Sequence, residues 1–214
     1  MASRKQFGFS LLELMITVSL MLVIAGVTFV WLQPLLADSH LNSGYDTTLM
    51  VLRNTRNLAI TQGHEYYVNF NPVGFPAGTI QVEYQAPAVG VGALPPLQQV
   101  RTYTIPSDIT FGVRAGFPAN APDGFGAGIV AIDFGESSNC AGLNYVVFMP
   151  DGSSQFGPNG CAGSANPYNS GVIYITNPGG PIYSSRAVSV WGATGRIRGW
   201  RLGQQAGNPI WVQQ

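Results

Sequence analysis

A continuous apolar segment near the N-terminus constrains this chain more than any other feature. It covers residues 7–32, FGFSLLELMITVSLMLVIAGVTFVWL, and contains a single formal charge, Glu13. At about 1.5 Å per residue, a helix of this length crosses the hydrocarbon core of a bilayer. An unpaired carboxylate in such a span costs on the order of 2.5–3.5 kcal/mol on insertion scales. We therefore expect a membrane-crossing helix in which Glu13 has a functional, charged partner.

The residues before this segment follow a specific order. Arg4 and Lys5 form a short basic leader, and Gly8 and Phe9 then precede Ser-Leu-Leu-Glu. This order, GFSLLELM followed by an apolar span, resembles the class III leader of type IV prepilins and pseudopilins. An ordinary secretory signal would be cut beyond its apolar core, behind small residues, and the span would be lost. The alternative interpretation is a signal anchor that tolerates one acid near its end.

The resemblance implies how the N-terminus is processed and used. A prepilin peptidase is expected to cut between Gly8 and Phe9, so that residues 1–8 leave as the leader and Phe9 becomes N-methylated. Glu13 is expected to pair with the new terminal ammonium at Phe9 of a neighbouring subunit. Both charges are costly when buried alone, so their pairing selects the docked geometry more than it adds stability.

A helix is predicted to continue beyond the apolar segment. Pro34 should kink it, because proline removes a backbone donor and clashes with the preceding turn. Apolar residues nevertheless recur beyond it at mostly three- and four-residue steps: Leu41, Tyr45, Leu49, Leu52, Ala59 and Ile60. Gly63 is suited to end the helix as its C′ residue. We expect a helix over 9–62, with 9–36 in the membrane or a filament core and 37–62 amphipathic.

The rest of the chain, residues 63–214, is predicted to form one β-rich globular domain. The chain contains 27 glycines and 15 prolines but only 9% charged residues, a composition that favours strands and turns. Alternating or β-branched stretches predict strands over 65–70, 79–84, 100–105, 109–113, 129–134, 145–149, 172–176, 186–191 and 196–201. Segments 86–96, 116–128 and 157–168 are predicted to be surface loops. The predicted fold class is therefore α+β.

Patterns within this domain resemble the GspH/FimT family of minor pilins and pseudopilins. An apolar strand enters a turn over 146–153, VVFMPDGS, and the stretches GVIYI, RAVSV and GRI follow over 171–175, 186–190 and 195–197. The resemblance implies the pilin fold, in which a long, partly transmembrane helix packs on an antiparallel β-rich domain. The alternative for the turn is a hairpin that uses Asp and Gly only for their backbone preferences. We assign Asp151 no catalytic role.

Charge and cysteine usage predict export. Arg4 and Lys5 lie on the short side of the span, so the N-terminus is expected in the cytoplasm and the domain outside it. With the resemblance, this implies a single-pass protein of the bacterial inner membrane with a periplasmic or extracellular domain. Cys140 and Cys161 are the only cysteines, and a disulfide between them would contribute roughly 3 kcal/mol by closing a loop of about 20 residues. Two buried free thiols are the alternative.

Catalytic and metal-binding functions find little support in the sequence. His40 and His64 are the only histidines, and no nucleophile elbow, zinc-protease, Walker or complete dinucleotide motif is present. Two cysteines without a nearby histidine do not supply a zinc site. The run 133–136, DFGE, is a weak calcium candidate. We predict that the protein is not an enzyme and has no cofactor or metal.

Three non-enzymatic functions are compatible with these features. The resemblance implies a minor pilin that assists assembly of a type IV pilus, or a pseudopilin of a type II secretion system. The third possibility is a pilus-borne DNA-binding minor pilin for uptake of exogenous DNA. In all three, Glu13 guides the assembly of a subunit through its N-terminal helix. The expected partners are the membrane, other pilins, the prepilin peptidase and the inner-membrane assembly platform. The sequence does not separate the pilus from the secretion system.

The DNA hypothesis rests on the basic C-terminal segment. No acidic residue follows Asp151, whereas four arginines do: Arg186, Arg196, Arg198 and Arg201. Alternation puts Arg196, Arg198 and Trp200 on one strand face, where guanidinium and indole groups suit phosphates and an exposed base. Some FimT-like minor pilins that bind DNA carry a G-R-x-R motif, which residues 195–198 match. Against this, loss of the leader leaves eight arginines and ten acidic residues, and a solvated edge strand is the simpler explanation.

Overall fold

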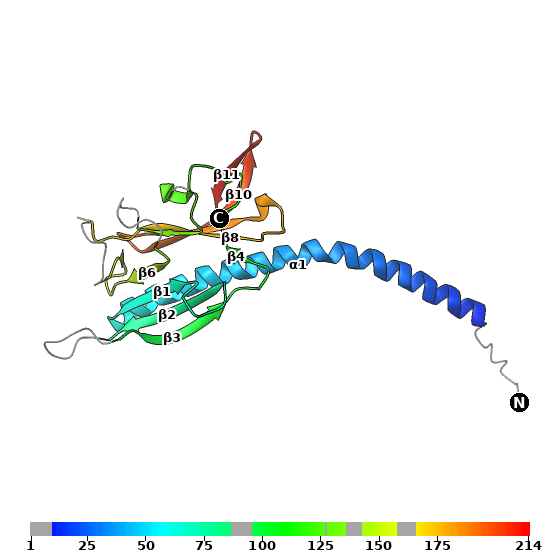
Figure 1. Ribbon diagram of the computed structural model, residues 1–214, viewed down its shortest axis with the longest axis horizontal. Coiled ribbons are helices and arrows are strands. Elements are labelled where there is room, and N and C mark those ends of the chain that lie inside the picture. Colours follow the sequence, from blue (N-terminus) through cyan, green and yellow to red (C-terminus); the bar gives the residue numbers. More distant parts are fainter. Residues whose placement is uncertain (1–9, 87–95, 127, 136–142, 158–165) are drawn as a thin grey trace, which may run out of the picture. The chain divides into compact units, whose positions relative to one another are not determined.

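The computed structural model describes residues 10–86, 96–126, 128–135, 143–157 and 166–214 (Figure 1). The chain divides after Ala37 into two compact units, Met1–Ala37 and Asp38–Gln214. Helix α1, Leu11–Gln62, begins in the first unit and ends in the second. All strands belong to the second unit.

The first unit contains the apolar part of α1. The stretch Leu11–Thr28 has a mean hydropathy of 2.2 and none of it is buried, so this helix is long and apolar enough to cross a membrane. Glu13 is the acidic residue of its first turn. The helix continues through Pro34, which lies in its interior.

The C-terminal end of α1 lies where the sequence predicts it. Gly63 has a φ of 70°, and its N–H donates to the carbonyl oxygen of Ala59 at 3.0 Å. This left-handed conformation favours glycine, which has no Cβ to strain the backbone, and it caps the helix by satisfying one of its last carbonyls. Of the predicted helix over 9–62, residues 11–62 are helical, whereas Ser10 is not and Phe9 lies outside the described residues.

The second half of α1 is amphipathic, with one buried face. The predicted apolar positions are buried as far as Ala59: Leu41, Tyr45, Leu49, Leu52 and Ala59. Val51 and the hydroxyl residues Thr48 and Thr55 are buried as well, and both hydroxyls donate to a carbonyl oxygen four residues back. Ile60 is a correction, because its side chain is 44% exposed. The buried stripe ends at Ala59, and Ile60 lies beside the turn at Gly152 instead.

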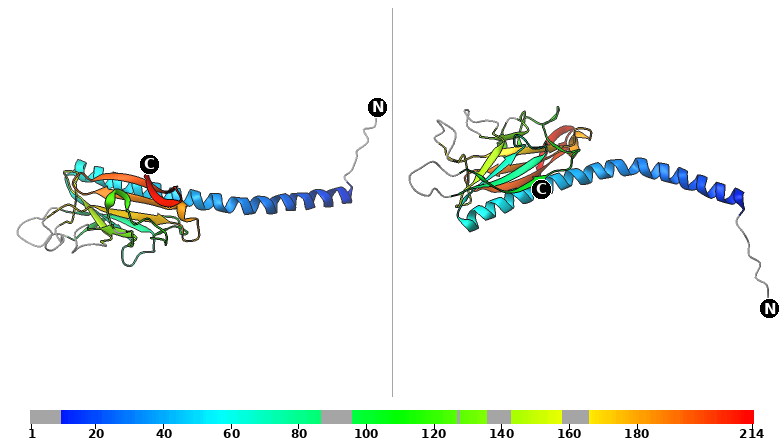
Figure 2. Two further views of the ribbon diagram at one scale, coloured as in Figure 1. Left: turned by 90° about the horizontal axis from the view of Figure 1, so that it is seen from above. Right: turned by 60° about the horizontal axis from the view of Figure 1, so that its bottom comes forward.

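A first antiparallel sheet follows the helix. Its strands are β1 (Glu65–Phe70), β2 (Thr79–Gln85), β3 (Gln98–Thr104), β6 (Tyr145–Phe148) and β7 (Ser154–Gln155). They pair in the order β3-β2-β1-β6-β7. Within the second unit, the cyan part of α1 runs alongside this sheet (Figure 2).

A second antiparallel sheet comes from the C-terminal half of the domain. Its strands are β4 (Thr110–Phe111), β8 (Gly171–Thr176), β9 (Arg186–Trp191), β10 (Arg196–Gln205) and β11 (Asn208–Gln213), in the order β11-β10-β9-β8-β4. Strand β5 (Ile132–Phe134) also pairs with β8. Two short 3-10 helices, η1 (Pro122–Gly124) and η2 (Ile182–Ser184), lie in the connections.

Every predicted strand has a counterpart, but their extents differ. The stretch predicted over 109–113 shortens to β4, and the one over 129–134 shortens to β5, whereas the last predicted strand extends to Gln205. Strands β7 and β11 are additional. Neither offers a clear alternating pattern, since β7 is only Ser-Gln and β11 contains Pro209. They form because neighbouring strands supply their hydrogen-bond partners.

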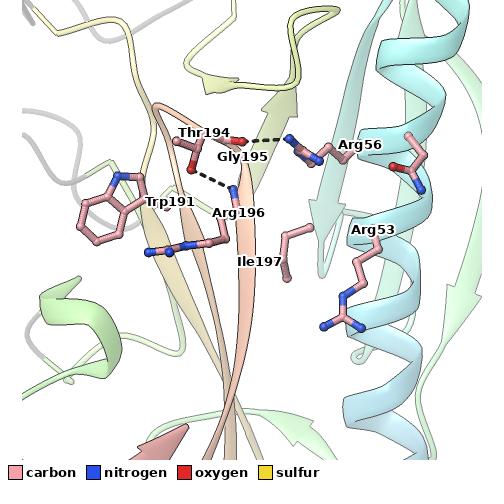
Figure 3. Close-up of a pocket in the computed structure, with 8 residues that line it drawn as sticks. Arg53, Arg56, Trp191, Thr194, Gly195, Arg196 and Ile197 are labelled. Atoms are coloured by element: carbon pink, nitrogen blue, oxygen red, sulfur yellow. Dashed lines mark hydrogen bonds between the residues drawn. The ribbon is translucent and has the colours of Figure 1, made fainter. Parts of the chain in front are cut away.

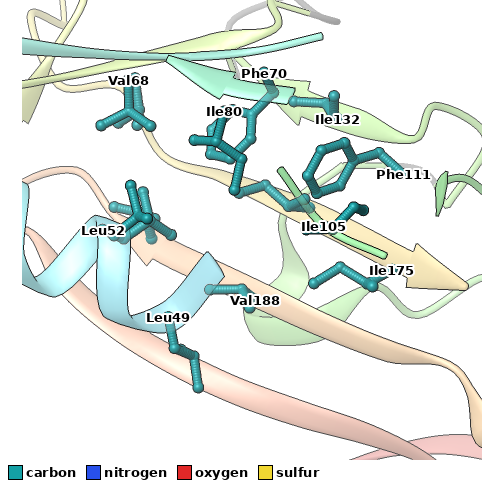
Figure 4. Packing of buried hydrophobic residues seen from close by; sticks show 14 of the residues in the cluster. Leu49, Leu52, Val68, Phe70, Ile80, Ile105, Phe111, Ile132, Ile175 and Val188 are labelled. Carbon is teal, nitrogen blue, oxygen red and sulfur yellow. The ribbon is translucent and has the colours of Figure 1, made fainter. Parts of the chain in front are cut away.

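The core of the second unit joins the helix to both sheets. Leu49 and Leu52 of α1 belong to one buried cluster with Val68 and Phe70 of β1 and with Val188 of β9 (Figure 4). Because the helix and the two sheets share this cluster, residues from Asp38 onward form one compact body. The architecture is α+β, as predicted from the sequence.

Candidate functional site

Glu13 is an exposed carboxylate in the first turn of an exposed apolar helix. Its neighbours Leu12, Leu14 and Met15 are also exposed. Among the residues that the structure describes, Glu13 has no ion-pair partner. An acid at a helix N-terminus is favoured by the helix dipole, but this does not neutralise its charge in hydrocarbon. The predicted processing residues, Gly8 and Phe9, lie outside the described residues.

Two of the predicted nucleic-acid-binding side chains are held by partners within the domain. The guanidinium of Arg198 forms an ion pair with Asp123 of η1. The second Asp123 oxygen accepts from the Ser189 hydroxyl at 2.6 Å, and the Trp200 indole N–H donates to the same hydroxyl at 2.9 Å. The Asp123 side chain is only 6% exposed and that of Arg198 is 26% exposed. This network fastens η1 to β9 and β10.

Arg186 has a comparable structural position. It is 6% exposed and donates to the carbonyl oxygen of Ser184 at 2.7 Å and to the amide oxygen of Asn42 at 3.0 Å. Burial lowers the pKa of its guanidinium, and the nearby charge of Arg201 lowers it further. Its hydrogen bonds connect the start of β9 to α1, and it is not part of an exposed basic surface.

The remaining predicted arginines, Arg196 and Arg201, are exposed. Arg201 pairs in register with Arg186, and Arg196 pairs in register with Trp191, at opposite ends of the β9–β10 ladder. The guanidinium carbon of Arg196 lies 5.7 Å from the centre of the Trp191 ring. The five predicted residues therefore do not form one continuous exposed surface, since three of them have partners inside the domain.

The structure instead places Arg196 and two arginines of α1 around one cleft, although the Arg196 side chain turns away from α1 toward Trp191 (Figure 3). A cleft of about 660 Å³ lies between α1 and the β9–β10 turn. Its lining residues are Arg53, Arg56, Asn57, Trp191, Thr194, Gly195, Arg196 and Ile197. In Figure 3 the α1 arginines extend from the helix toward the hairpin that carries Arg196 and Trp191. We call this the three-arginine cleft.

Arg56 fixes the walls of this cleft. Its Nε donates to the Gly152 carbonyl oxygen at 3.0 Å, and its Nη2 donates to the Thr194 carbonyl oxygen at 3.0 Å. Gly195, with a φ of 58°, lies so close to Gly152 that a Cβ there would collide with that carbonyl. The Pro-Asp-Gly turn and the β9–β10 turn are thus held together by one guanidinium. Figure 3 shows its hydrogen bond to Thr194.

Sequence reasoning missed this cleft because its parts are distant in the chain. Arg56 and Thr194 are 138 positions apart. The one available signal was that Arg53 and Arg56 lie off the apolar stripe of α1, which indicates exposure but not what the side chains meet.

The other sequence candidates have ordinary surroundings or lie outside the described residues. His40 Nδ1 contacts Asp108 at 3.0 Å, and the His64 ring lies near that of Tyr84. Within the described ranges, no group of three or more His, Cys, Asp or Glu side chains could hold a metal ion. The predicted disulfide residues, Cys140 and Cys161, lie outside those ranges, as does Glu136 of the calcium candidate.

Comparison with known proteins bears on the N-terminus. A family model described as the prokaryotic N-terminal methylation motif matches residues 3–29. The N-terminus is a class III prepilin leader. The leader prediction is thereby confirmed, and the apolar helix behind it fits a membrane-anchored protein.

Comparisons that use the whole chain say less about its function than the N-terminal motif does. No curated protein sequence matches it. Among solved structures, the type IV minor pilin FimU of Pseudomonas aeruginosa strain PAO1 is similar, with a TM-score of 0.43 and 11% sequence identity, over 80% of this chain and 93% of that chain. A structural similarity with so low an identity and TM-score supports no functional assignment. The methylation motif at the N-terminus is therefore the comparison that bears on function.

Proposed function

We propose that the protein is a minor pilin or pseudopilin, a subunit that enters a type IV pilus or a type II secretion pseudopilus and assists its assembly. The observation that carries this proposal is the methylation motif over 3–29, continuous with an apolar helix of which no part of Leu11–Thr28 is buried. An apolar surface of this extent is not stable in water. Lipid would cover it before assembly, and the helices of neighbouring subunits would cover it afterwards.

Processing follows from the leader. The prepilin peptidase cuts between Gly8 and Phe9 and methylates the new N-terminus, and the helix stays in the product. Arg4 and Lys5 keep the leader in the cytoplasm, so the globular domain is on the periplasmic or extracellular side. The inner-membrane assembly platform then moves the processed subunit from the membrane into the filament.

Glu13 directs this assembly. Its carboxylate is unpaired in the described part of the subunit, and the N-terminal ammonium of Phe9 in an adjacent subunit supplies the missing positive charge. Only a correctly docked neighbour places the two charges together. The ion pair therefore selects the correct position of one subunit relative to the next.

The globular domain gives the subunit its specific surface. In the oxidising compartment, Cys140 and Cys161 form a disulfide that closes the loop between them. The proposal assigns the protein a structural role and no catalytic one. The nucleic-acid alternative is not favoured by the geometry, because Arg186, Arg198 and Trp200 bind partners inside the domain.

The decisive experiment is fractionation of sheared filaments. We expect the full chain to be recovered with pili, or with pseudopili when the secretion system is overproduced, and to be absent from that fraction in cells without the prepilin peptidase. Recovery only in the membrane fraction of peptidase-positive cells would refute the proposal. To identify the machine that uses this subunit, pilus components and secretion components are deleted in turn. The deletion that abolishes recovery names the machine.

A further inference from the structure

The loop between β1 and β2 presents apolar side chains to solvent. It covers residues 71–78, NPVGFPAG, and contains no charged residue. Val73 is 99% exposed and Phe75 is 42% exposed. Single exposed apolar side chains are common on protein surfaces, but here two of them lie close together in an uncharged loop. Apolar residues grouped in this way indicate a contact surface.

The backbone of this loop is held by hydrogen bonds of its own. The side-chain oxygen of Asn71 accepts from the Gly78 N–H at 2.7 Å, which joins the two ends of the loop. The Phe75 N–H donates to the Pro72 carbonyl oxygen at 3.2 Å. The exposure of Val73 and Phe75 is therefore a property of a loop with a defined conformation.

The loop lies at the end of the domain where α1 enters it. A Cβ at Gly78 would lie 2.8 Å from the Ile105 side chain, and a Cβ at Gly44 of α1 would lie 3.5 Å from the same side chain. The loop and this turn of α1 are thus neighbours. Gly44 follows Ala37, the last residue of the first unit, by seven positions (44 − 37), which is about 10 Å along a helix axis.

This end of the domain is the one that meets a membrane. The helix of the first unit is long and apolar enough to cross a bilayer, and none of Leu11–Thr28 is buried. Once that helix is inserted, the residues that follow it pass through a headgroup layer about 5–8 Å thick on each side. The end of the domain near Gly44 is therefore closest to the lipid surface, and the apolar loop 71–78 belongs to it.

An exposed tyrosine lies at the same end. Tyr183 of η2 is 36% exposed. Arg186 fixes η2 to α1, because it donates both to the Ser184 carbonyl oxygen and to the side-chain oxygen of Asn42. Tyrosine is enriched at membrane–water interfaces, where its ring is in an apolar layer and its hydroxyl is hydrated. A second element at this end thus has a side chain suited to a lipid surface.

The acidic side chains at this end have basic neighbours. Asp108 contacts His40 Nδ1 at 3.0 Å, and the charge of Asp38 acts on the buried guanidinium of Arg186. Arg201 is exposed and pairs in register with Arg186, and a guanidinium group suits the phosphate oxygens of a lipid. Charge at this end is therefore compatible with a phospholipid surface.

We propose that loop 71–78 docks the globular domain on the membrane surface, with Val73 and Phe75 inserted at the boundary between headgroups and acyl chains. Insertion removes their apolar surface from water, which favours binding at this depth. The contact holds the domain against the lipid until the subunit leaves the membrane. This inference rests on the membrane anchor of the proposed function and not on its role in a filament.

A lipid-quenching measurement on the full-length protein tests the contact. A fluorescent amino acid with an environment-sensitive aminonaphthalene ring replaces Val73, and the protein is reconstituted at a high lipid-to-protein ratio in vesicles of phosphatidylethanolamine and phosphatidylglycerol. Part of the lipid carries a nitroxide quencher near the top of its acyl chain. We expect blue-shifted emission and quenching several-fold stronger than when the same ring replaces Val100. Equal quenching at the two positions would overturn the proposal.

Val100 is a matched control position. It is also an exposed valine, but it lines a groove with Leu58 and Thr61, near the other end of α1. The comparison therefore holds the residue type constant and changes only the end of the domain that carries the reporter.

A charge substitution tests whether the apolar side chains drive insertion. With the reporter at position 73, Phe75→Asp should lower the quenching to the level found at position 100, because a carboxylate is costly among acyl chains. Leu97→Asp is the control, since Leu97 is 39% exposed and adjoins β3, and it should leave the quenching unchanged. Quenching that persists in the Phe75 variant contradicts the proposal.

A neighbouring subunit is the other occupant that the experiments identify. Benzoylphenylalanine in place of Val73 is irradiated in membranes of cells that lack the assembly platform. Cross-links to phospholipid are expected there. Cross-links to another pilin, together with weak quenching in vesicles, would show that protein covers the loop and would overturn the proposal.

These outcomes separate the inference from the proposed function. If the chain never enters filaments, the proposed function fails, and the quenching still decides whether the loop contacts lipid. If the chain enters filaments and the reporters at positions 73 and 100 are quenched equally, only the docking proposal fails. A full-length chain that does not float with vesicles contradicts both.

Discussion

Arg198 forms an ion pair with Asp123, a residue 75 positions earlier in the chain. Asp123 has a φ of 56°, and its carboxylate is almost fully covered, with Ser189 as a second partner. The pair explains why a guanidinium predicted to face solvent has a structural role. It fixes the connection that contains η1 against β9 and β10.

Replacing Arg198 should therefore affect stability more than surface charge. Arg198→Gln leaves the covered Asp123 carboxylate without its charged partner, so we expect a loss of about 1–3 kcal/mol in the free energy of unfolding. Urea unfolding of the processed protein in detergent, followed by near-ultraviolet circular dichroism, measures it. Arg201→Gln is the control, since this side chain is exposed on the same strand. Equal stabilities of the two variants would show that the ion pair contributes nothing.

A second prediction concerns the contact between α1 and β10 at Gly199. A Cβ at this position would overlap the Tyr45 hydroxyl and lie 2.8 Å from Cζ of the same ring. Gly199→Ala should therefore destabilise the domain by about 1–3 kcal/mol through overpacking. Gly179→Ala is the control, since the closest atom to a Cβ there is 3.7 Å away. The substitution Tyr45→Ala should make Gly199→Ala nearly neutral; additive losses in the double variant would argue against the steric explanation.

The leader predicts how the residue before the cleavage site limits processing. Gly8→Ala should be processed in part, because alanine is small, whereas Gly8→Val should block cleavage and leave the chain in the membrane fraction. N-terminal mass spectrometry checks this, and the wild type should begin with N-methylated Phe9. An intact Met1 in the wild type from peptidase-positive cells would refute the cleavage site.

Glu13→Ala should impair assembly into filaments without impairing folding of the domain. Removal of a charge from the apolar helix favours membrane insertion, so the variant should reach the membrane with a folded domain. Its recovery in sheared filaments should fall at least several-fold, because the charge that selects register is absent. Ser19→Ala, on the same helix, is the control and should assemble normally. Wild-type recovery of the Glu13 variant would exclude a role in assembly.

The cysteine prediction is tested by thiol accessibility. Cys140 and Cys161 should resist alkylation in protein exported by cells, and should each react after reduction, as detected by a mass increase on intact protein. Replacing both with serine should lower stability by roughly 3 kcal/mol on the loop-closure account. Alkylation of both thiols without a reductant would rule out the bridge.

Much of the fold could be predicted because it depends on local patterns. The apolar span and the residues before it identify the leader and the helix, and Gly63 marks the helix end through its left-handed backbone. The strands with alternating or β-branched residues were found for the same reason. Strands β7 and β11 were not found, because their pairing with β6 and β10 depends on neighbours and not on their own residues.

The sequence by itself determined that this protein has a prepilin leader, a long N-terminal helix and a β-rich domain, since side-chain periodicity and backbone preference act over a few residues. Tertiary structure alone decided which arginines are free. Folding pairs Arg198 with Asp123, buries Arg186 beside Asn42, and brings Arg53 and Arg56 of α1 to the hairpin that carries Arg196. These contacts join segments separated by 75 to 144 positions. Whether a charge meets a partner or solvent there depends on how the helix and the two sheets pack, which no local pattern encodes.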